Sequence, residues 1–322
     1  MLRNFGTLIL KPISILGLAI LIVLMTSSIF GQNATPPSII EIIAKAAAQR
    51  AIYLEEFKNL ISKETKTFEM FDKKGQVKKR RSITSVFIVY QTSKSNEAVE
   101  FRNIVAVDGK DITNTDKRAE QFFEQVIGAQ SSDKELQKLR DESSRFDEEI
   151  SIDGLTLFQA VALADNLRPF FEFRHIGNEQ LEGRDTIVLS YEQTRASPFI
   201  LTGNSANPAG ANLTLRYDID ISGEANHRLK GKLWLDAATM QVRREIRQLM
   251  VRPERFSAPV IYSEQEFHYG QSDFPLLPPT RIVHTQNELK MKDMTAIREA
   301  RVVFEYETFT RPDVNVESSD VK

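Results

Sequence analysis

The chain has 322 residues, of which 41% are hydrophobic and 27% charged, with a formal net charge of −2 and no cysteine. A charge so near balance excludes a general nucleic-acid binder, which carries a clear basic excess. The lack of cysteine excludes disulfides, thiolate catalysis and zinc–thiolate sites, so the fold depends on its core alone.

Residues 1–31 have the pattern of an export signal. Arg3 and Lys11 supply positive charge, Ile15–Met25 is an unbroken run of apolar residues and glycine, and the small residue Gly31 precedes a polar stretch. The export machinery and its peptidase recognise this order of a basic start, a short apolar block and a small residue. We therefore expect cleavage after Gly31 and a mature protein that is periplasmic or secreted.

An uncleaved anchor in the inner membrane is the alternative for the same segment. Pro12–Phe30 carries no charge and is just long enough to span a bilayer. Without a cysteine near the cut, the chain is not expected to be a lipoprotein. Loss of Arg3 and Lys11 with the signal would lower the net charge from −2 to −4. We expect residues 32–311 to form a single domain and residues 312–322 to be a disordered tail.

A helix is predicted at the start of the mature protein. Ser38 and Glu41 have the spacing of a capping box, in which each side chain satisfies the other residue's free backbone N–H. Behind them, apolar residues recur at helical spacing as far as Ile52. The pattern predicts a helix from Ser38 to about Glu56.

Most of the remaining chain predicts an antiparallel sheet. In residues 99–107, Phe101 and its apolar neighbours alternate with Glu100 and Arg102, and Asp108-Gly109 supplies a turn. The clearest alternation is at residues 213–221, which predicts a strand with one covered face. Further strands are predicted at residues 80–92, 184–192, 229–236, 240–251, 259–269, 280–292 and 298–309. Residues 204–211 are predicted to be a loop.

The stretch 114–165 interrupts this sheet with three predicted helices, at residues 115–128, 132–148 and 155–165. Each has one apolar stripe, represented by Phe122, Leu139 and Phe158. A helix with one apolar face has to bury that face on something, and we expect the buried face of the sheet to receive all three.

Two charged clusters allow a functional and a structural interpretation. Lys78, Lys79, Arg80 and Arg81 end a basic run at residues 73–81, which could contact an anionic membrane surface or simply form a solvated hairpin tip. The acidic residues 147–149 could supply a glycosidase carboxylate pair, but a solvated helix end is the expected interpretation.

No catalytic or metal-binding pattern is found. The four histidines, at positions 175, 227, 268 and 284, have no second ligand at the spacing a metal site needs. There is no Gly-x-Ser-x-Gly elbow and no His-Glu-x-x-His helix. We therefore expect neither a metal nor a cofactor, and no enzymatic activity.

The hairpin at residues 231–244 is the most distinctive stretch of the sequence. Leu233 and Leu235 flank the only tryptophan, Trp234, and Asp236 begins a short turn. This pattern resembles the central hairpin of the LolA/LolB-like superfamily of outer-membrane lipoprotein carriers, and the chain also resembles uncharacterised exported bacterial proteins. The resemblance implies an α+β fold, a large curved antiparallel sheet in the form of an open half-barrel, with helices covering its concave face.

Three hypotheses about function remain, and the first two differ in whether aromatic residues line a cavity. If an apolar cavity lies under the helices, its expected walls are Phe122, Phe123, Phe158, Phe171 and one side of Trp234, and the protein binds an acyl chain, a lipoprotein or another apolar ligand. If the space is filled, the protein is an envelope regulator or scaffold. An unrecognised hydrolase is the third hypothesis. The sequence leaves the cavity and the oligomeric state open.

The export signal gives the first testable prediction. Residues 1–31 should be absent from the native protein, because the short apolar block and Gly31 suit the signal peptidase. Intact-mass measurement decides this, and a mass that includes Met1 would favour the anchored form.

Overall fold

The computed structural model describes residues from Pro37 onward, and those from Ile39 onward form one compact unit. The described residues are 37–91, 98–112, 117, 121–122, 124–125, 133–148, 150, 152, 154–203, 213–217, 219, 226–253 and 255–311. The signal segment, the loop at 204–211, Phe123, Glu149 and the tail at 312–322 lie outside them. In the part of the chain that is described, no helix is long and apolar enough to cross a membrane.

The first element is the helix α2, Ile39–Glu56, in agreement with the prediction. Ile42, Ala46, Arg50 and Tyr53 are buried, at spacings of four, four and three residues, so a single face of the helix contacts the rest of the protein.

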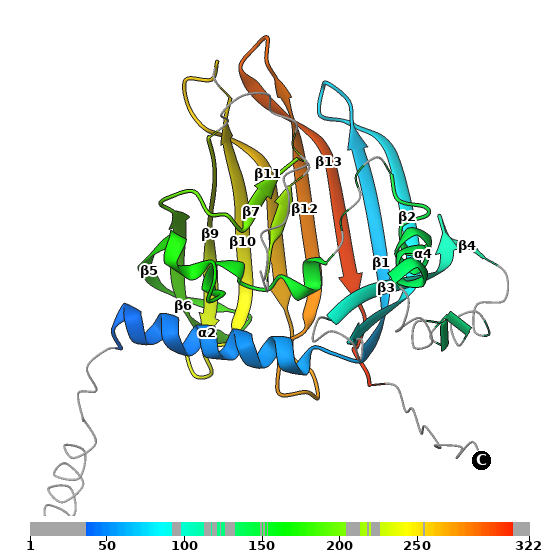
Figure 1. Ribbon diagram of the computed structural model, residues 1–322, viewed down its shortest axis with the longest axis horizontal. Helices are drawn as coiled ribbons and strands as arrows, with labels where there is room; N and C mark the ends of the chain where they lie inside the picture. Colours follow the sequence, from blue (N-terminus) through cyan, green and yellow to red (C-terminus); the bar gives the residue numbers. More distant parts are fainter. Residues whose placement is uncertain are drawn as a thin grey trace, which may run out of the picture. The chain divides into compact units, whose positions relative to one another are not determined.

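Eleven strands then form one sheet in which all neighbouring strands are antiparallel. Its order is β4-β3-β2-β1-β13-β12-β11-β10-β9-β6-β5, and it is open, with β4 and β5 at its ends (Figure 1). The strands are β1 (Leu60–Phe71), β2 (Val77–Gln91), β3 (Ala98–Val107), β4 (Lys110–Asp111), β5 (Phe171–Leu181), β6 (Arg184–Gln193), β9 (Asn226–Asp236), β10 (Val242–Arg252), β11 (Val260–Tyr269), β12 (Pro279–Lys290) and β13 (Thr295–Tyr306). The α+β fold with a large open antiparallel sheet is therefore confirmed.

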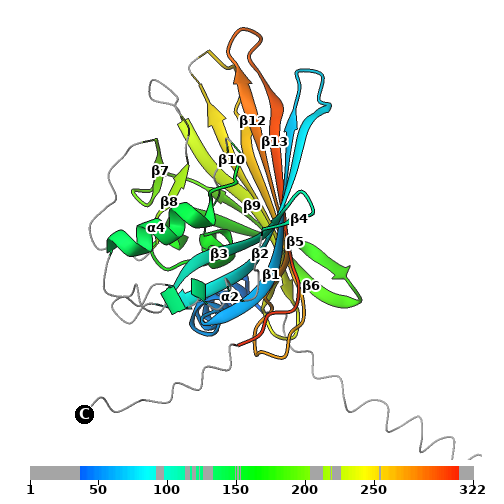
Figure 2. The same ribbon diagram turned by 90° about the vertical axis from the view of Figure 1, so that its right-hand side faces the viewer.

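Alternation along the strands gives the sheet an inner and an outer face. The inner face carries the main hydrophobic core and is covered by α2, by three short 3-10 turns at 155–157, 161–163 and 168–170, and by a small separate sheet. One inner-face row runs Met70, Ala300, Gln286, Ser263, Leu249 and Leu229 across β1, β13, β12, β11, β10 and β9. Figure 2 shows α2 and the small sheet beside the same face.

The small sheet corrects the prediction for residues 213–221. Only Leu215–Tyr217 (β8) is a strand, and it pairs in parallel with Ile200–Thr202 (β7) instead of joining the antiparallel sheet. Ile200, Leu215 and Ile219 belong to the inner-face core, so the alternation correctly predicted one covered face. We call residues 199–203, 213–217 and 219 the flap.

The helical stretch also differs from its prediction. Residues 155–165 form 3-10 turns in place of an α-helix, and the second predicted helix is shorter, at Asp133–Ser143 (α4). The first lies mostly outside the described residues, although residues 121–122 and 124–125 are helical.

The side chains of β3 point to the opposite faces from those that its alternation predicted. Phe101 packs with Ile88, Phe122 and Leu139 in a second core on the outer face, and α4 lies along β3 there (Figure 2). Glu100 and Arg102, expected to face water, are buried on the inner face with 7% and 3% of their surface exposed. The expectation that all the helices cover one face is therefore wrong for α4 and for Phe122.

The strand β5 was not predicted from the sequence, although the turn that follows it is characteristic of a hairpin. The β5–β6 hairpin turns at Glu182-Gly183, where both residues have positive φ, 52° and 75°. A two-residue turn of this kind is typical of a tight hairpin, and it would have indicated β5.

Candidate functional site

A short irregular segment, residues 154–160, crosses the inner face and is held there by side chains rather than by a regular helix. Glu100 accepts hydrogen bonds from the backbone N–H groups of Gly154, at 3.1 Å, and Thr156, at 3.0 Å. Glu245 accepts one from the N–H of Ala160 at 2.8 Å. We call residues 154–160 the crossing segment.

Its carbonyl groups are bound in the same way. Tyr53 donates to the carbonyl of residue 156 at 2.8 Å, and Arg50 to that of residue 159 at 2.9 Å, so α2 holds two of them. Arg247 on β10 donates to the carbonyl of residue 158 at 2.5 Å. Because a buried backbone group without a partner is costly, these bonds allow the segment to lie on the sheet without helical structure.

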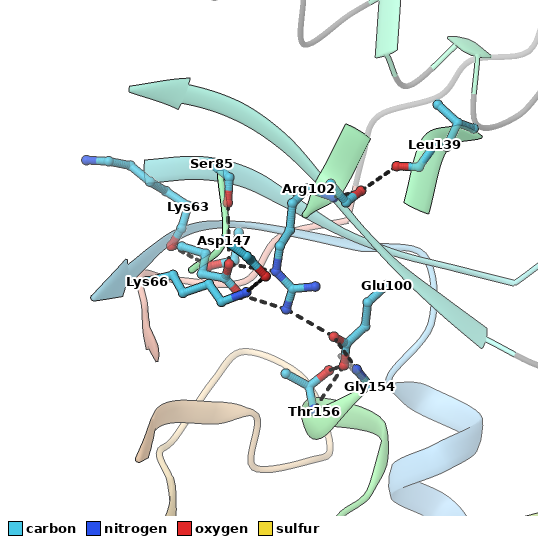
Figure 3. A network of polar contacts seen from close by, with 12 residues as sticks. Lys63, Lys66, Ser85, Glu100, Arg102, Leu139, Asp147, Gly154 and Thr156 are labelled. Carbon is cyan, nitrogen blue, oxygen red and sulfur yellow. Dashed lines mark hydrogen bonds and ion pairs between the residues drawn. The ribbon is translucent and has the colours of Figure 1, made fainter. Parts of the chain in front are cut away.

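The first of two buried charge networks lies over β1 and β3 (Figure 3). Arg102 binds both carboxylate oxygens of Glu64, at 2.8 and 3.1 Å, and also Glu100 at 3.0 Å. Burial opposes the charge of Arg102, but Glu64 and Glu100 outweigh it and raise the pKa of Arg102 well above its usual value. Glu100 thereby joins the arginine to the crossing segment.

Lys66 of β1 lies beside this network and bonds to Asp147 at 2.5 Å (Figure 3). Both side chains are buried, with 2% and 5% exposed, and the ammonium lies over the rings of Phe68 and Phe304. Burial lowers the pKa of Lys66, although Asp147 opposes that shift.

The second network is centred on β10. Arg247 bonds to Glu245 at 3.0 Å, and Tyr191 donates to the same carboxylate at 3.0 Å. Gln265 accepts from Arg247 at 3.3 Å and lies 3.4 Å from Nδ1 of His284. These groups are buried, and their contacts tie β6, β10, β11 and β12 to one another.

The flap is attached to the inner face by a different kind of contact. Its buried side chains share the apolar core with Leu229, Leu249 and Val251 of the main sheet. Asn166 donates to the carbonyl of Leu213 at 2.9 Å. Burial raises the pKa of Tyr217 to about 12, against an opposing effect of Arg247, which places its hydroxyl within electrostatic reach of β10.

Of the five aromatic residues singled out from the sequence, Phe123 lies outside the described residues, and the structure separates the other four. Phe158 and Phe171 pack on the inner-face core. Phe122 packs on the outer face against Phe101, with ring centroids 6.5 Å apart. Trp234 also points to the outer face, where it donates to Glu179 at 2.8 Å and Arg244 lies over its ring. Phe122 and Trp234 therefore do not share a face with Phe158, contrary to expectation.

The basic run is also more engaged than expected. Lys79 and Arg81 form ion pairs with Glu148 at 2.5 and 3.0 Å, and Arg80 lies 3.9 Å from Glu69. Lys78 is exposed. The solvated interpretation of the acidic cluster is thus wrong for Asp147 and Glu148, which tie their segment to β1 and β2.

Two cavities lined by described residues bear on the question of a ligand. The larger, of about 680 Å³, is a groove on the outer face lined by Glu172, Arg174, Glu192, Lys230, Lys232 and Glu264 among others, and its mixed charge does not suit an acyl chain. The smaller, of about 10 Å³, lies between α2 and Leu276–Leu277. The residues that the structure describes contain no cluster of acids and histidines fit to hold a metal ion.

No protein-family model matches the chain, and no curated protein matches it. Among solved structures, it is similar to a DUF1329 family protein from Desulfovibrio piger (9% identity, 84% of this chain and 94% of that one, TM-score 0.34). It is also similar to a LolA superfamily protein from Nitrosomonas europaea (12%, 86% and 95%, TM-score 0.30). A third is a putative outer membrane lipoprotein-sorting protein domain from Vibrio parahaemolyticus (11%, 86% and 94%, TM-score 0.32).

The second of these structures is named for the LolA superfamily, which the hairpin at 231–244 resembles. At these TM-scores the likeness carries no argument about what this chain binds.

Breaking the Lys66–Asp147 pair should be far more costly than breaking an exposed pair on the same strand. Asp147→Asn leaves a buried ammonium without its carboxylate, which costs about 3–5 kcal/mol of unfolding free energy. Glu307→Gln removes the acid from Lys63, whose pair is half exposed, and should cost at most about 1 kcal/mol. Denaturant unfolding measures both, and Lys66→Met added to Asp147→Asn should restore part of the loss. Equal losses for the two acids would contradict the buried tie.

The buried His284 predicts a loss of stability in acid. Burial lowers its pKa from 6.5 to about 4, so between these values the unfolded chain binds a proton that the folded protein does not. Stability should therefore fall as the pH drops through this window, by roughly 3 kcal/mol from this group. In His284→Gln the unfolding free energy, measured against pH, should lose that component, whereas His175→Gln, at an exposed position, should keep it. An unchanged acid slope in His284→Gln would refute the assignment.

Proposed function

We propose that the protein is an exported, non-catalytic binding module that holds an acyl chain, such as that of a lipoprotein, or another apolar ligand between the inner face and the flap. The flap is the observation that carries the proposal. It consists of two three-residue strands outside the main sheet, which place Ile200, Leu215 and Ile219 in the apolar core. Apolar contacts are non-directional, so a methylene chain can replace them.

The border of the flap supports the same site. Leu213 and Tyr217 on the flap and Val260 on β11 contact the inner-face core but are only half buried. Phe158 is half buried as well and lies at the crossing segment. These side chains offer apolar surface next to the flap, where a ligand could begin to enter. Phe158 and Phe171 remain proposed walls of the site.

The rest of the cover is held too firmly to open in this way. Lifting the crossing segment would break the hydrogen bonds that Glu100, Glu245 and Arg247 make to its backbone, at about 1.5–3 kcal/mol for each bond to a charged group. The buried acids are therefore positioned to hold the cover, which supports binding without chemistry. The pattern of residues 1–31 supports export.

A filled core favours a second candidate, an envelope scaffold or regulator that acts through its surface. The small cavity beside α2, about 10 Å³, holds no more than a water molecule. A ligand therefore has to displace the flap, and uptake of a ligand distinguishes the two candidates.

Uptake of a fluorescent fatty acid by the purified protein tests the proposal. Binding should be saturable, and Tyr217→Ser should weaken it about threefold, because burying the remaining exposed part of the aromatic side chain, at most about a third, amounts to about 0.6 kcal/mol. Ile176→Ser on β5 removes an exposed isoleucine outside the core and should leave the affinity unchanged. Thermal melting of each variant checks that the fold is kept.

The wild-type protein decides between the candidates. If it takes up no fatty acid, lysolipid or lipopeptide, the binding proposal is wrong and the scaffold is favoured. If Ile176→Ser weakens binding as much as Tyr217→Ser, the ligand does not lie at the flap.

A further inference from the structure

Two neighbouring hairpin turns expose apolar side chains at one end of the sheet. The β1–β2 turn carries Val77, which is 50% exposed, and the β12–β13 turn carries Met291 and Met294, which are 45% and 52% exposed. Because β1 pairs with β13, with Met70 opposite Ala300, the two turns project side by side. Figures 1 and 2 show both at the end of the sheet away from α2.

The ends of β1 and β13 that adjoin the two turns also contact each other beyond the last paired residues. The guanidinium of Arg298 lies 5.4 Å from the ring centroid of Phe71. Residues 71–78 and 288–298 thus form one continuous surface, which we call the tip surface.

The tip surface has a charge opposite to that of the chain as a whole. It holds six cations and three acids, a formal charge of +3, whereas the whole chain carries −2. Two of its acids are already engaged, because Asp72 accepts from the backbone N–H of Lys74 and Gln76 at 2.8 and 2.9 Å, and Glu288 pairs with Lys290. Lys73, Lys74, Lys78 and Lys292 are exposed.

Single exposed apolar residues are common on protein surfaces and need no explanation. Three of them on adjacent turns, two of which (Val77 and Met291) precede an exposed lysine, form a different pattern. A surface that combines apolar side chains with cations matches an anionic bilayer, where the apolar groups enter the interface and the cations face the headgroups. Charge complementarity therefore selects anionic lipid as the occupant.

We propose that the tip surface docks the protein on an anionic membrane, with Val77, Met291 and Met294 inserted among the headgroups and the lysines around them paired with lipid anions. Docking uses the exposed Lys73, Lys74 and Lys78 rather than the Lys79 and Arg81 pairs, which Glu148 already engages. The inference does not rest on the proposed ligand, because the tip surface and the flap share no residue.

Co-sedimentation of the mature protein with vesicles tests the charge. Vesicles of phosphatidylcholine and phosphatidylglycerol in equal parts should bind it, pure phosphatidylcholine vesicles should bind it weakly, and salt should reduce the binding. Lys74→Gln should weaken binding about fivefold, and the triple change of Lys73, Lys74 and Lys78 to Gln about a hundredfold. The matched control Lys45→Gln, on an exposed position of α2, should have no such effect.

Insertion is tested by a site-specific label, since the chain has no cysteine of its own. An environment-sensitive fluorophore on Met294→Cys should brighten on anionic vesicles, whereas the same label on Ile40→Cys, an exposed position on α2, should not. Equal binding to neutral vesicles, equal losses from Lys45→Gln and Lys74→Gln, or equal brightening at both labels would overturn the proposal. Absence of vesicle binding would also overturn it and would leave an acidic protein as the partner of this surface.

Discussion

The structure depends on hydrogen bonds between an irregular stretch of backbone and buried charged side chains. Each of the two supplies the partners that the other lacks. Residues 154–160 cross the inner face with one 3-10 turn and without the hydrogen bonds of an α-helix, and the sheet buries ionised side chains beneath them. Either feature alone would be costly, because unpaired backbone groups and unpaired charges are both expensive in a dry interior. Together they satisfy each other. The same arrangement occurs twice, as Glu100 with Arg102 and as Glu245 with Arg247, each acid facing the crossing segment two residues from its arginine.

This arrangement determines how the edge of the sheet is covered. Because the inner face of β3 is occupied by Glu100 and Arg102, the apolar Phe101 faces outward and needs a cover of its own, which α4 supplies through Leu139. The chain then continues from α4 to the inner face. On the way, Ser143 accepts a hydrogen bond from the backbone N–H of Arg102 at 3.0 Å, which occupies an otherwise open edge group.

Sequence periodicity predicted what depends on local pattern and failed where a tertiary contact decides. The helix at 39–56 and most strands follow from apolar spacing, since one face of each is buried in a continuous core. Periodicity treats a charged residue as an outward one, and so it misplaced Glu100 and Arg102. Their burial depends on partners on other elements, the backbone of Thr156 for Glu100 and the carboxylate of Glu64 for Arg102. It also assigned a helix to 155–165, because spacing cannot show that Glu100 and Glu245 replace the helical bonds. It indicated apolar roles for Phe158 and Phe171, which do pack on the inner-face core, but it did not separate the flap from the main sheet, because the flap strands are only three residues long.

The crossing segment is held by polar contacts and the flap mainly by apolar ones. This difference also indicates which part of the cover can move. Directional bonds to buried charges have few alternative partners, so the crossing segment has a single well-defined position. The flap is held mainly by burial of three apolar side chains, each contributing about 1.5–3 kcal/mol, and any apolar group that takes their place restores most of that free energy. An apolar ligand therefore offsets the cost of displacing the flap and cannot offset the cost of displacing the crossing segment. Under the proposed function, opening would occur at the flap alone, because only there would an apolar ligand supply what the displaced side chains had supplied.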